Sequence, residues 1–157
     1  LPPEEVRPYE NSVPIFDLEV AAAHDFSEEQ SIEVRDWVEL PDSFKPQPGH
    51  FVTRIVGESM NRRIPNGSWC LFKANPGGTR QGKVAIVQHR DIQDAETGTR
   101  CTVKVYSSEK SASDDGWGHD RVTLRPDSTV PGYRPIELGP DATRELRVIG
   151  VLVAILC

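Results

Sequence analysis

The sequence is poor in cysteine, and its three cysteines, Cys70, Cys101 and Cys157, stand far apart. No CxxC pair occurs, so the spacing typical of a zinc knuckle is missing. The odd count and the low density also argue against a secreted scaffold held together by disulfides. Cys70 and Cys101 stand among apolar residues, and we expect them to pack as small hydrophobic side chains.

Histidine motifs are missing as well. The four histidines are His24, His50, His89 and His119, and no two of them show an HxH or HxxxH spacing. Compact histidine pairs of that kind are the usual sequence sign of a metal site. We therefore expect no metal and no cofactor, and we place the histidines on the surface or in loops.

Basic charge and long apolar runs are scarce. Eighteen Lys and Arg stand against 24 Asp and Glu, which gives a net charge of −6. Because affinity for nucleic acid rests largely on basic side chains, we expect no direct nucleic-acid binding by this domain. No signal peptide opens the chain, and the closing run VIGVLVAILC is too short for a membrane-spanning helix. We expect a cytoplasmic protein without membrane contact.

The first residues are rich in proline and charge. Pro2, Pro3 and Pro8 alternate with charged residues, so residues 1–12 are predicted to form a linker or an extended arm. Residues 13–157 are enough for one domain with its own core. Because the sequence begins at Leu1 rather than Met, we expect it to be part of a longer protein.

From Phe51 onward the pattern favours β-strands, in short apolar runs separated by turn signals rich in Pro, Asn and Gly. The expected strands are residues 50–57, 68–74, 82–90, 100–107, 120–126 and 146–156. Ahead of them, residues 13–23 alternate in part and favour another strand. Ser27 is a possible cap for a short helix, but Ile32, Val34 and Trp37-Val38 suit a strand or extended segment as well. These patterns predict a mainly β domain.

One serine stands in an unusual place. Ser59 comes two residues after Gly57, at the end of the apolar run 51–56, and a turn signal follows at residues 65–67. The position suits either a plain surface turn or a nucleophile held by a tight backbone at the edge of a cleft. A serine hydroxyl reacts only when a base takes its proton, and no histidine stands where it would suggest a Ser-His-Asp triad.

Lys104 is the candidate base, although only a neutral lysine accepts a proton. The unperturbed pKa of a lysine is about 10.4, so such a base must lose its water or stand near other positive charge. In the expected strand RCTVKVYS, Lys104 shares one face with Thr102 and Tyr106. Lys104 is either a solvated lysine on the wet face of that strand or a base that another segment covers.

Taken in order, these motifs resemble the LexA-like serine peptidases, which include LexA, the phage repressors and the UmuD proteins. The resemblance runs from about Val13 to Leu156. Its most specific pieces are Gly57-Glu58-Ser59-Met60, Pro65-Asn66-Gly67-Ser68 and Thr102-Val103-Lys104-Val105. The resemblance implies the LexA C-terminal-domain-like fold of short, strongly twisted strands, a LexA-like peptidase domain over residues 13–157, and a Ser-Lys dyad.

The resemblance also implies roles for single residues. Ser59 matches the family's nucleophile and Lys104 its general base. The backbone N–H groups of Glu58 and Ser59 would form the oxyanion hole. Gly57 would let the backbone bend closely. For Met60, we expect core packing beneath the site rather than a chemical role.

Members of this family cleave themselves ahead of the serine, usually between alanine and glycine. Residues 20–23 (VAAA) resemble that segment, and the candidate scissile bond is Ala22–Ala23. Alanine replaces glycine after the cut, where its methyl group would clash or stiffen the loop, and the segment also suits a strand end or a linker. Two functions stay open: a regulatory, autoproteolytic serine peptidase, or a catalytically silent dimerisation or sensing module of a larger DNA-metabolism, repressor or defence protein.

The implied partners are proteins. The resemblance implies a homodimer, cleavage of the chain's own segment or of one protein substrate, and a RecA-type filament as activator, as in the SOS response and in transcriptional regulation. Residues 1–50 show no pair of helices with the tight turn of a helix-turn-helix. The chain is therefore expected not to be a complete repressor.

Overall fold

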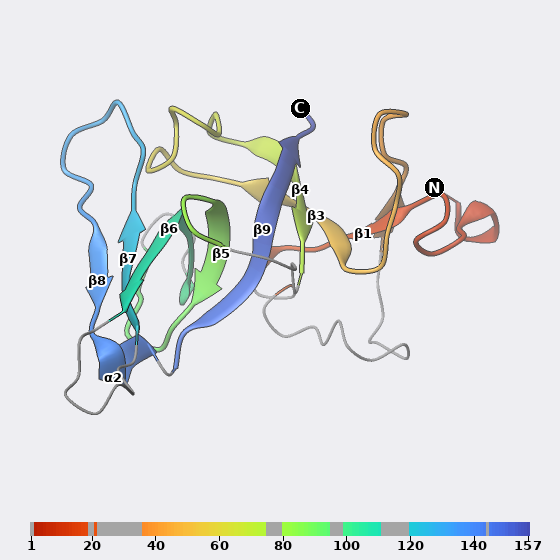
Figure 1. The fold of residues 1–157 in the computed structure, drawn as a ribbon. Helices are drawn as coiled ribbons and strands as arrows, with labels where there is room; N and C mark the ends of the chain where they lie inside the picture. The colour runs from red at the N-terminus through yellow and green to blue at the C-terminus, as the bar shows by residue number, and fades with distance from the viewer. Residues whose placement is uncertain are drawn as a thin grey trace.

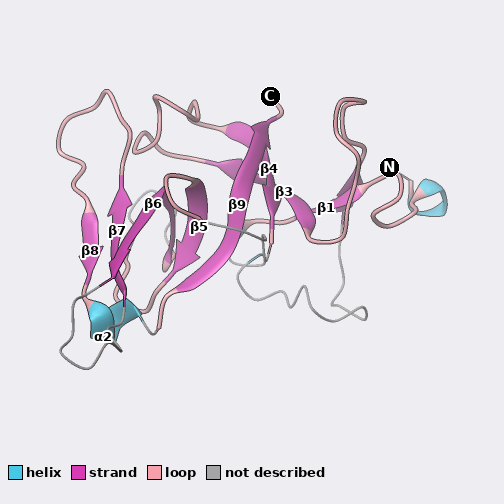
Figure 2. Ribbon diagram, viewed as in Figure 1, coloured by secondary structure: helices cyan, strands magenta, loops and turns pink. Residues whose placement is uncertain are grey.

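A single mixed sheet dominates the fold. The computed structural model describes residues 2–18, 21, 36–74, 80–94, 99–110, 120–143 and 145–157. Within them, nine strands form one sheet in the order β2-β1-β3-β4-β9-β5-β6-β7-β8 (Figure 1, Figure 2). The strands are β1 (Val13–Ile15), β2 (Asp36–Val38), β3 (His50–Ile55), β4 (Ser68–Lys73), β5 (Val84–Gln88), β6 (Cys101–Lys110), β7 (Asp120–Arg125), β8 (Ile136–Leu138) and β9 (Arg147–Ile155). The prediction of a mainly β domain is confirmed.

The strands expected from residue 50 onward are all present as β3, β4, β5, β6, β7 and β9, with ends that differ by a few residues. β2 contains Trp37-Val38, which also suited a strand, whereas β8 and the helix α2 (Pro140–Thr143) were not predicted. The strand expected over residues 13–23 ends at Ile15 instead. After the strand, the Ala21 N–H donates to the Asp17 carbonyl at 2.9 Å, which is the i to i−4 bond of a helical turn. The helix expected at Ser27 lies outside the described residues.

Residues 2–12 contain a 3-10 turn, η1 (Pro3–Glu5), and lead into β1 at the edge of the sheet (Figure 1). The Tyr9 ring meets the Trp37 ring edge to face at 5.5 Å, and Ser12 is fully buried. β1 then pairs in parallel with β3 and antiparallel with β2.

β9 joins the two halves of the sheet. It pairs antiparallel with β4 on one side and with β5 on the other, and Figure 1 shows it as one long curved strand between them. The pairing slips by one residue at two places, between Leu71 and Phe72 on β4 and between Ile86 and Val87 on β5. Such bulges bend a strand and increase its twist, so β9 can turn from one half toward the other.

The core consists of apolar clusters on the faces of this bent sheet. In the largest, the Phe51 and Phe72 rings stack at 5.8 Å, and Met60 and Cys70 are buried beside them. Cys101 belongs to the same cluster. The expected packing of Met60 and of the two cysteines is thus confirmed. Among the described residues, no helix has the length and apolar character that crossing a membrane requires.

Candidate active site

Ser59 stands in a tight connection that leaves β3. Gly57 has φ +106°, in a region that side-chain-bearing residues rarely adopt, which confirms the expected close bend. The Gly57 N–H donates to the Asn66 Oδ1 atom at 2.8 Å, and the Asn66 side chain donates to Glu58 at 3.2 Å. The next residue, Met60, anchors the connection in the core. Ser59 is therefore held by backbone and side chains on both sides.

A second segment, residues 126–130, fixes the peptide groups on either side of Ser59. The Ser128 hydroxyl donates to the Glu58 carbonyl at 2.6 Å. The Asp127 N–H donates to the Ser59 carbonyl at 2.9 Å. Because the N–H and C=O of one peptide group point in opposite directions, the bond from Ser128 turns the Ser59 N–H away from residue 128.

Lys104 reaches Ser59 from the other half of the sheet. It lies on β6, opposite Ala85 of β5, and its Nζ atom is 3.1 Å from the Ser59 Oγ atom. Only 7% of the Lys104 side chain is exposed. The alternative of a solvated Lys104 on a wet face is therefore wrong, because the connection that carries Ser59 covers that face of β6.

Two further groups contact the Lys104 amine. Its Nζ atom lies 2.7 Å from Thr102 Oγ1 and 3.1 Å from the Val103 carbonyl oxygen. Thr102 Oγ1 is in turn 2.6 Å from Asp94 Oδ2, which lies 4.0 Å from Lys104 Nζ. Asp94 has no sequence signal, because it comes from the irregular connection between β5 and β6. The face shared by Thr102 and Lys104 was the only hint of this contact.

A buried histidine shapes the same connection. The His89 side chain is fully buried although it lies in the loop after β5. The expectation of surface or loop histidines is wrong for His50, which is buried in β3. The His89 Nδ1 atom accepts the Asp91 N–H at 3.0 Å, and its Nε2 atom lies 2.8 Å from the Ala142 carbonyl oxygen. His89 thereby ties residues 89–91 to α2 and sets the path of the chain toward Asp94.

Ser59 and Lys104 open onto a cleft of about 580 Å³. Its wall carries apolar side chains, carboxylates and one guanidinium group. The other lining residues are Asp91, Ile92, Gln93, Asp94, Thr102, Tyr133, Arg134 and Ile136. A buried amine in contact with a hydroxyl at such a cleft is chemically able to act as a base toward that hydroxyl.

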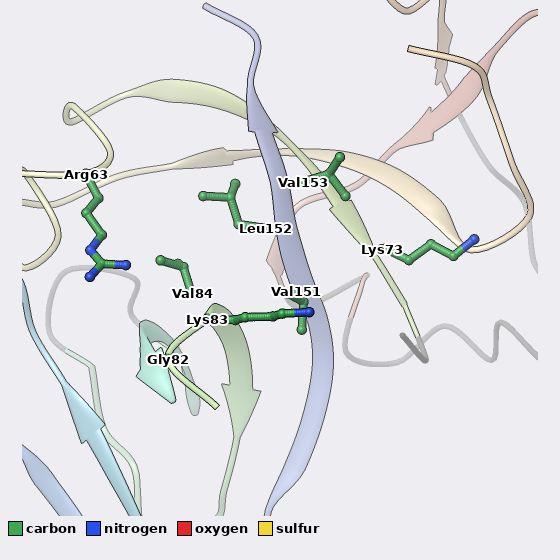
Figure 3. A pocket seen from close by; sticks show the side chains of 8 residues that line it. All are labelled: Arg63, Lys73, Gly82, Lys83, Val84, Val151, Leu152 and Val153. Carbon is green, nitrogen blue, oxygen red and sulfur yellow. The ribbon is translucent and has the colours of Figure 1, made fainter. Parts of the chain in front are cut away.

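Another hollow, of about 340 Å³, lies beside β9. Figure 3 shows Leu152 and Val84 turned toward each other there, with Lys83 reaching toward β9. Arg63 at its rim is paired with Asp127 at 2.8 Å. None of the residues that line this hollow carries a hydroxyl, thiol or carboxylate. Its surface offers no counterpart to the Ser59–Lys104 contact.

The described residues contain no group of three or more His, Cys, Asp and Glu placed to hold a metal ion. The candidate scissile bond Ala22–Ala23 lies outside the described residues. Ala21, the residue before it, is 1% exposed and belongs to the same apolar cluster as Met60.

Comparison with known families places most of the chain in one of them. The family described as Peptidase S24-like matches residues 14–153, a range that includes Ser59, Lys104 and every strand except the ends of β1 and β9. Comparison with curated proteins gives no match.

Proposed function

This chain belongs to the Peptidase S24-like family, and we propose that it acts as a serine peptidase with Ser59 as nucleophile and Lys104 as general base. The family supports a LexA-like, peptidase-type domain. The observation that carries the finer assignment is the 3.1 Å contact between the buried Lys104 amine and the Ser59 hydroxyl. Burial helps this chemistry, because removing water disfavours the charged lysine and so favours the form that accepts a proton.

The proposed reaction is acyl transfer to serine and then to water. Neutral Lys104 takes the Ser59 proton while Ser59 Oγ bonds to the carbonyl carbon of the scissile peptide. The protonated lysine then gives that proton to the leaving amine as the C–N bond breaks. Water next attacks the acyl-serine, Lys104 takes one proton from that water, and the proton returns to Ser59 Oγ as the new carboxyl group leaves.

The backbone N–H groups of Ser59 and Glu58 are proposed to stabilise the oxyanion. Support comes from the bond between Ser128 and the Glu58 carbonyl, which holds the peptide group of the Ser59 N–H in one orientation. Donors that are already oriented need no reorganisation when the charge develops, and losing one typically costs about 3–4 kcal/mol of transition-state stabilisation.

The proposed substrate is the chain's own segment, cut between Ala22 and Ala23, with a regulatory result. Support comes from Ala21, whose burial in the cluster of Met60 ties the residue before this segment to the core beneath the serine connection. In the alternative form of this proposal, Ser59 and Lys104 keep the same roles but cleave a different protein.

Intact-mass measurement tests the proposal. The chain is incubated from about pH 7 to about pH 10, where a growing share of a buried lysine is neutral, with and without a RecA-type filament. The expected result is two fragments that meet at Ala22–Ala23, formed faster at higher pH and absent in Ser59→Ala and Lys104→Ala. Equal cleavage in either variant would overturn the dyad.

Exposed apolar side chains favour a second function, self-association. Val153 and Ile155 on β9 are 44% and 41% exposed, and Trp69 on the neighbouring β4 is 38% exposed. Water-exposed apolar groups gathered near one strand often mark an interface. The proposed partner is a second copy of the chain. Sedimentation should give a dimer for the native chain and a monomer for Val153→Asp; an unchanged monomer in both would exclude this function.

A further inference from the structure

Three acceptors of the described residues lie within hydrogen-bond distance of the Lys104 amine. Thr102 Oγ1, the Val103 carbonyl oxygen and Ser59 Oγ lie 2.7, 3.1 and 3.1 Å from Nζ. A lysine ammonium carries three donors, so the charged amine donates to all three groups. The charged form therefore satisfies these three contacts but cannot accept the Ser59 proton.

A neutral amine has two N–H groups and one lone pair, so one of the three contacts must reverse. The Val103 carbonyl only accepts. A threonine hydroxyl can accept or donate, and Thr102 alone would be able to turn its own proton toward the amine. In that arrangement the lone pair of Lys104 would face Thr102 instead of Ser59. Lys104 could then not take the proton of the Ser59 hydroxyl.

Asp94 removes this ambiguity. Its ionised carboxylate has no proton to give, so the 2.6 Å contact between Thr102 Oγ1 and Asp94 Oδ2 must use the Thr102 proton. Thr102 is 1% exposed, so no bulk water competes for that bond. We propose that Asp94 is a positioning residue: it fixes Thr102 as an acceptor and so directs the lone pair of neutral Lys104 to the Ser59 hydroxyl.

The backbone holds Asp94 in this place. Its N–H donates to the Thr99 carbonyl at 3.1 Å, which closes the connection across from β6. Upstream, buried His89 fixes the start of the same connection through its bond from the Asp91 N–H. The orientation of the Asp94 carboxylate therefore belongs to the fold and does not depend on a bound substrate.

The Asp94 carboxylate also affects the protonation of Lys104. At 4.0 Å, Asp94 favours the ammonium form of Lys104 and so delays its deprotonation as pH rises. The other charged or titratable groups of the cleft are Asp91, Tyr133 and Arg134. Asp94 therefore has two separable effects, one on the direction of the lone pair and one on the pH at which the lone pair becomes available.

The inference rests on the proposed function. Four variants separate these two effects, and a fifth is the control for net charge. Asp94→Asn keeps an acceptor for the Thr102 proton but loses the charge, whereas Asp94→Ala loses both. Thr102→Ser keeps the hydroxyl, and Thr102→Val removes it. Asp42→Asn, on the turn between β2 and β3, makes the same change in net charge away from the cleft.

The test is the rate at which a fluorophosphonate labels Ser59, measured by intact mass across pH. At the high-pH plateau, Asp94→Ala and Thr102→Val should be slower than the native chain by about tenfold or more, and Asp94→Asn and Thr102→Ser should stay within about threefold. For Asp94→Asn the rising part of the profile should move to lower pH by about one unit, and for Asp42→Asn it should not move. A native plateau rate in Asp94→Ala would overturn the proposal.

A native chain that is not labelled at any pH would overturn the proposed function, and the role of Asp94 then has its own measurement. The titration of Lys104 is followed by NMR on a chain with ¹³C at the lysine ε positions, with Lys104→Ala identifying the signal. A lower titration midpoint in Asp94→Asn would support the coupling of Asp94 to Lys104. Equal midpoints in the native chain and in Asp94→Asn would overturn it.

Discussion

The Lys104 Nζ atom lies 3.1 Å from the Ser59 Oγ atom although the two residues are 45 positions apart. Ser59 comes from the connection between β3 and β4, and Lys104 comes from β6 across the sheet. Within the described part of the sheet, the strand pairing that joins the two halves runs through β9, which pairs with β4 and with β5. The contact therefore depends on the bend of β9 as well as on the two residues themselves.

Replacing Gly57 should slow the reaction of Ser59 by more than the loss of folding stability explains. Gly57→Ala places a side chain at φ +106°, which costs about 1–3 kcal/mol of folding free energy. Gly82→Ala is the matched control, because Gly82 also has positive φ (+74°) and a Cβ atom there would meet nothing within 4 Å. Thermal unfolding should show similar losses for both. Ser59 labelling should fall at least tenfold only for Gly57→Ala, and equal labelling rates would refute this role of Gly57.

The bond from Ser128 to the Glu58 carbonyl should matter more for reactivity than for stability. Ser128→Ala removes a 2.6 Å hydrogen bond, which is expected to lower the free energy of unfolding by about 1 kcal/mol. Ser108→Ala removes a 3.3 Å bond to Gln81 outside the cleft and serves as its control. Slower labelling of Ser59 in Ser128→Ala, but not in Ser108→Ala, is the expected result. The idea fails if the two variants react alike.

His50 should make the protein less stable in mild acid. Burial, and then the positive charge of Lys73, lower the pKa of His50 below its usual value. The unfolded chain then binds a proton at a pH where native His50 stays neutral. The stability is fully present above about pH 6.5 and is lost as pH falls, by at most about 1.4 kcal/mol per pH unit. The free energy of unfolding, measured with urea at several values between about pH 5 and 7, should change less with pH in His50→Leu than in the native chain. The same pH dependence of the unfolding free energy in both proteins would contradict this account.

The cysteines should differ in reactivity. Burial, with a smaller contribution from Cys157, raises the pKa of the Cys70 thiol to about 12. Because the thiolate is the reactive form, Cys70 should resist iodoacetamide at about pH 8. Cys101 is 1% exposed, whereas Cys157 is exposed. The native chain should take up one adduct, at Cys157, and the unfolded chain three. A native adduct on Cys70 would disprove the burial argument.

The sequence predicted the strands well, because alternating apolar residues and turn signals are local properties. β8 and α2 were missed, since each is only three or four residues long. Motif order pointed to Ser59 and Lys104 as candidates, whereas the burial of Lys104 could not be predicted from its own strand. That burial depends on a connection that arrives from β3, and Asp94 and His89 likewise gain their positions from long-range contacts.

The most direct test of the central claim is to locate the fluorophosphonate adduct by peptide mapping in the native chain and in Lys104→Met, which keeps the length of the buried side chain but has no amine. We predict an adduct on Ser59 in the native chain and none in Lys104→Met. Circular dichroism should show that both proteins are folded. An adduct on Ser59 in both proteins, or in neither, would contradict the assignment of Ser59 and Lys104 as nucleophile and base.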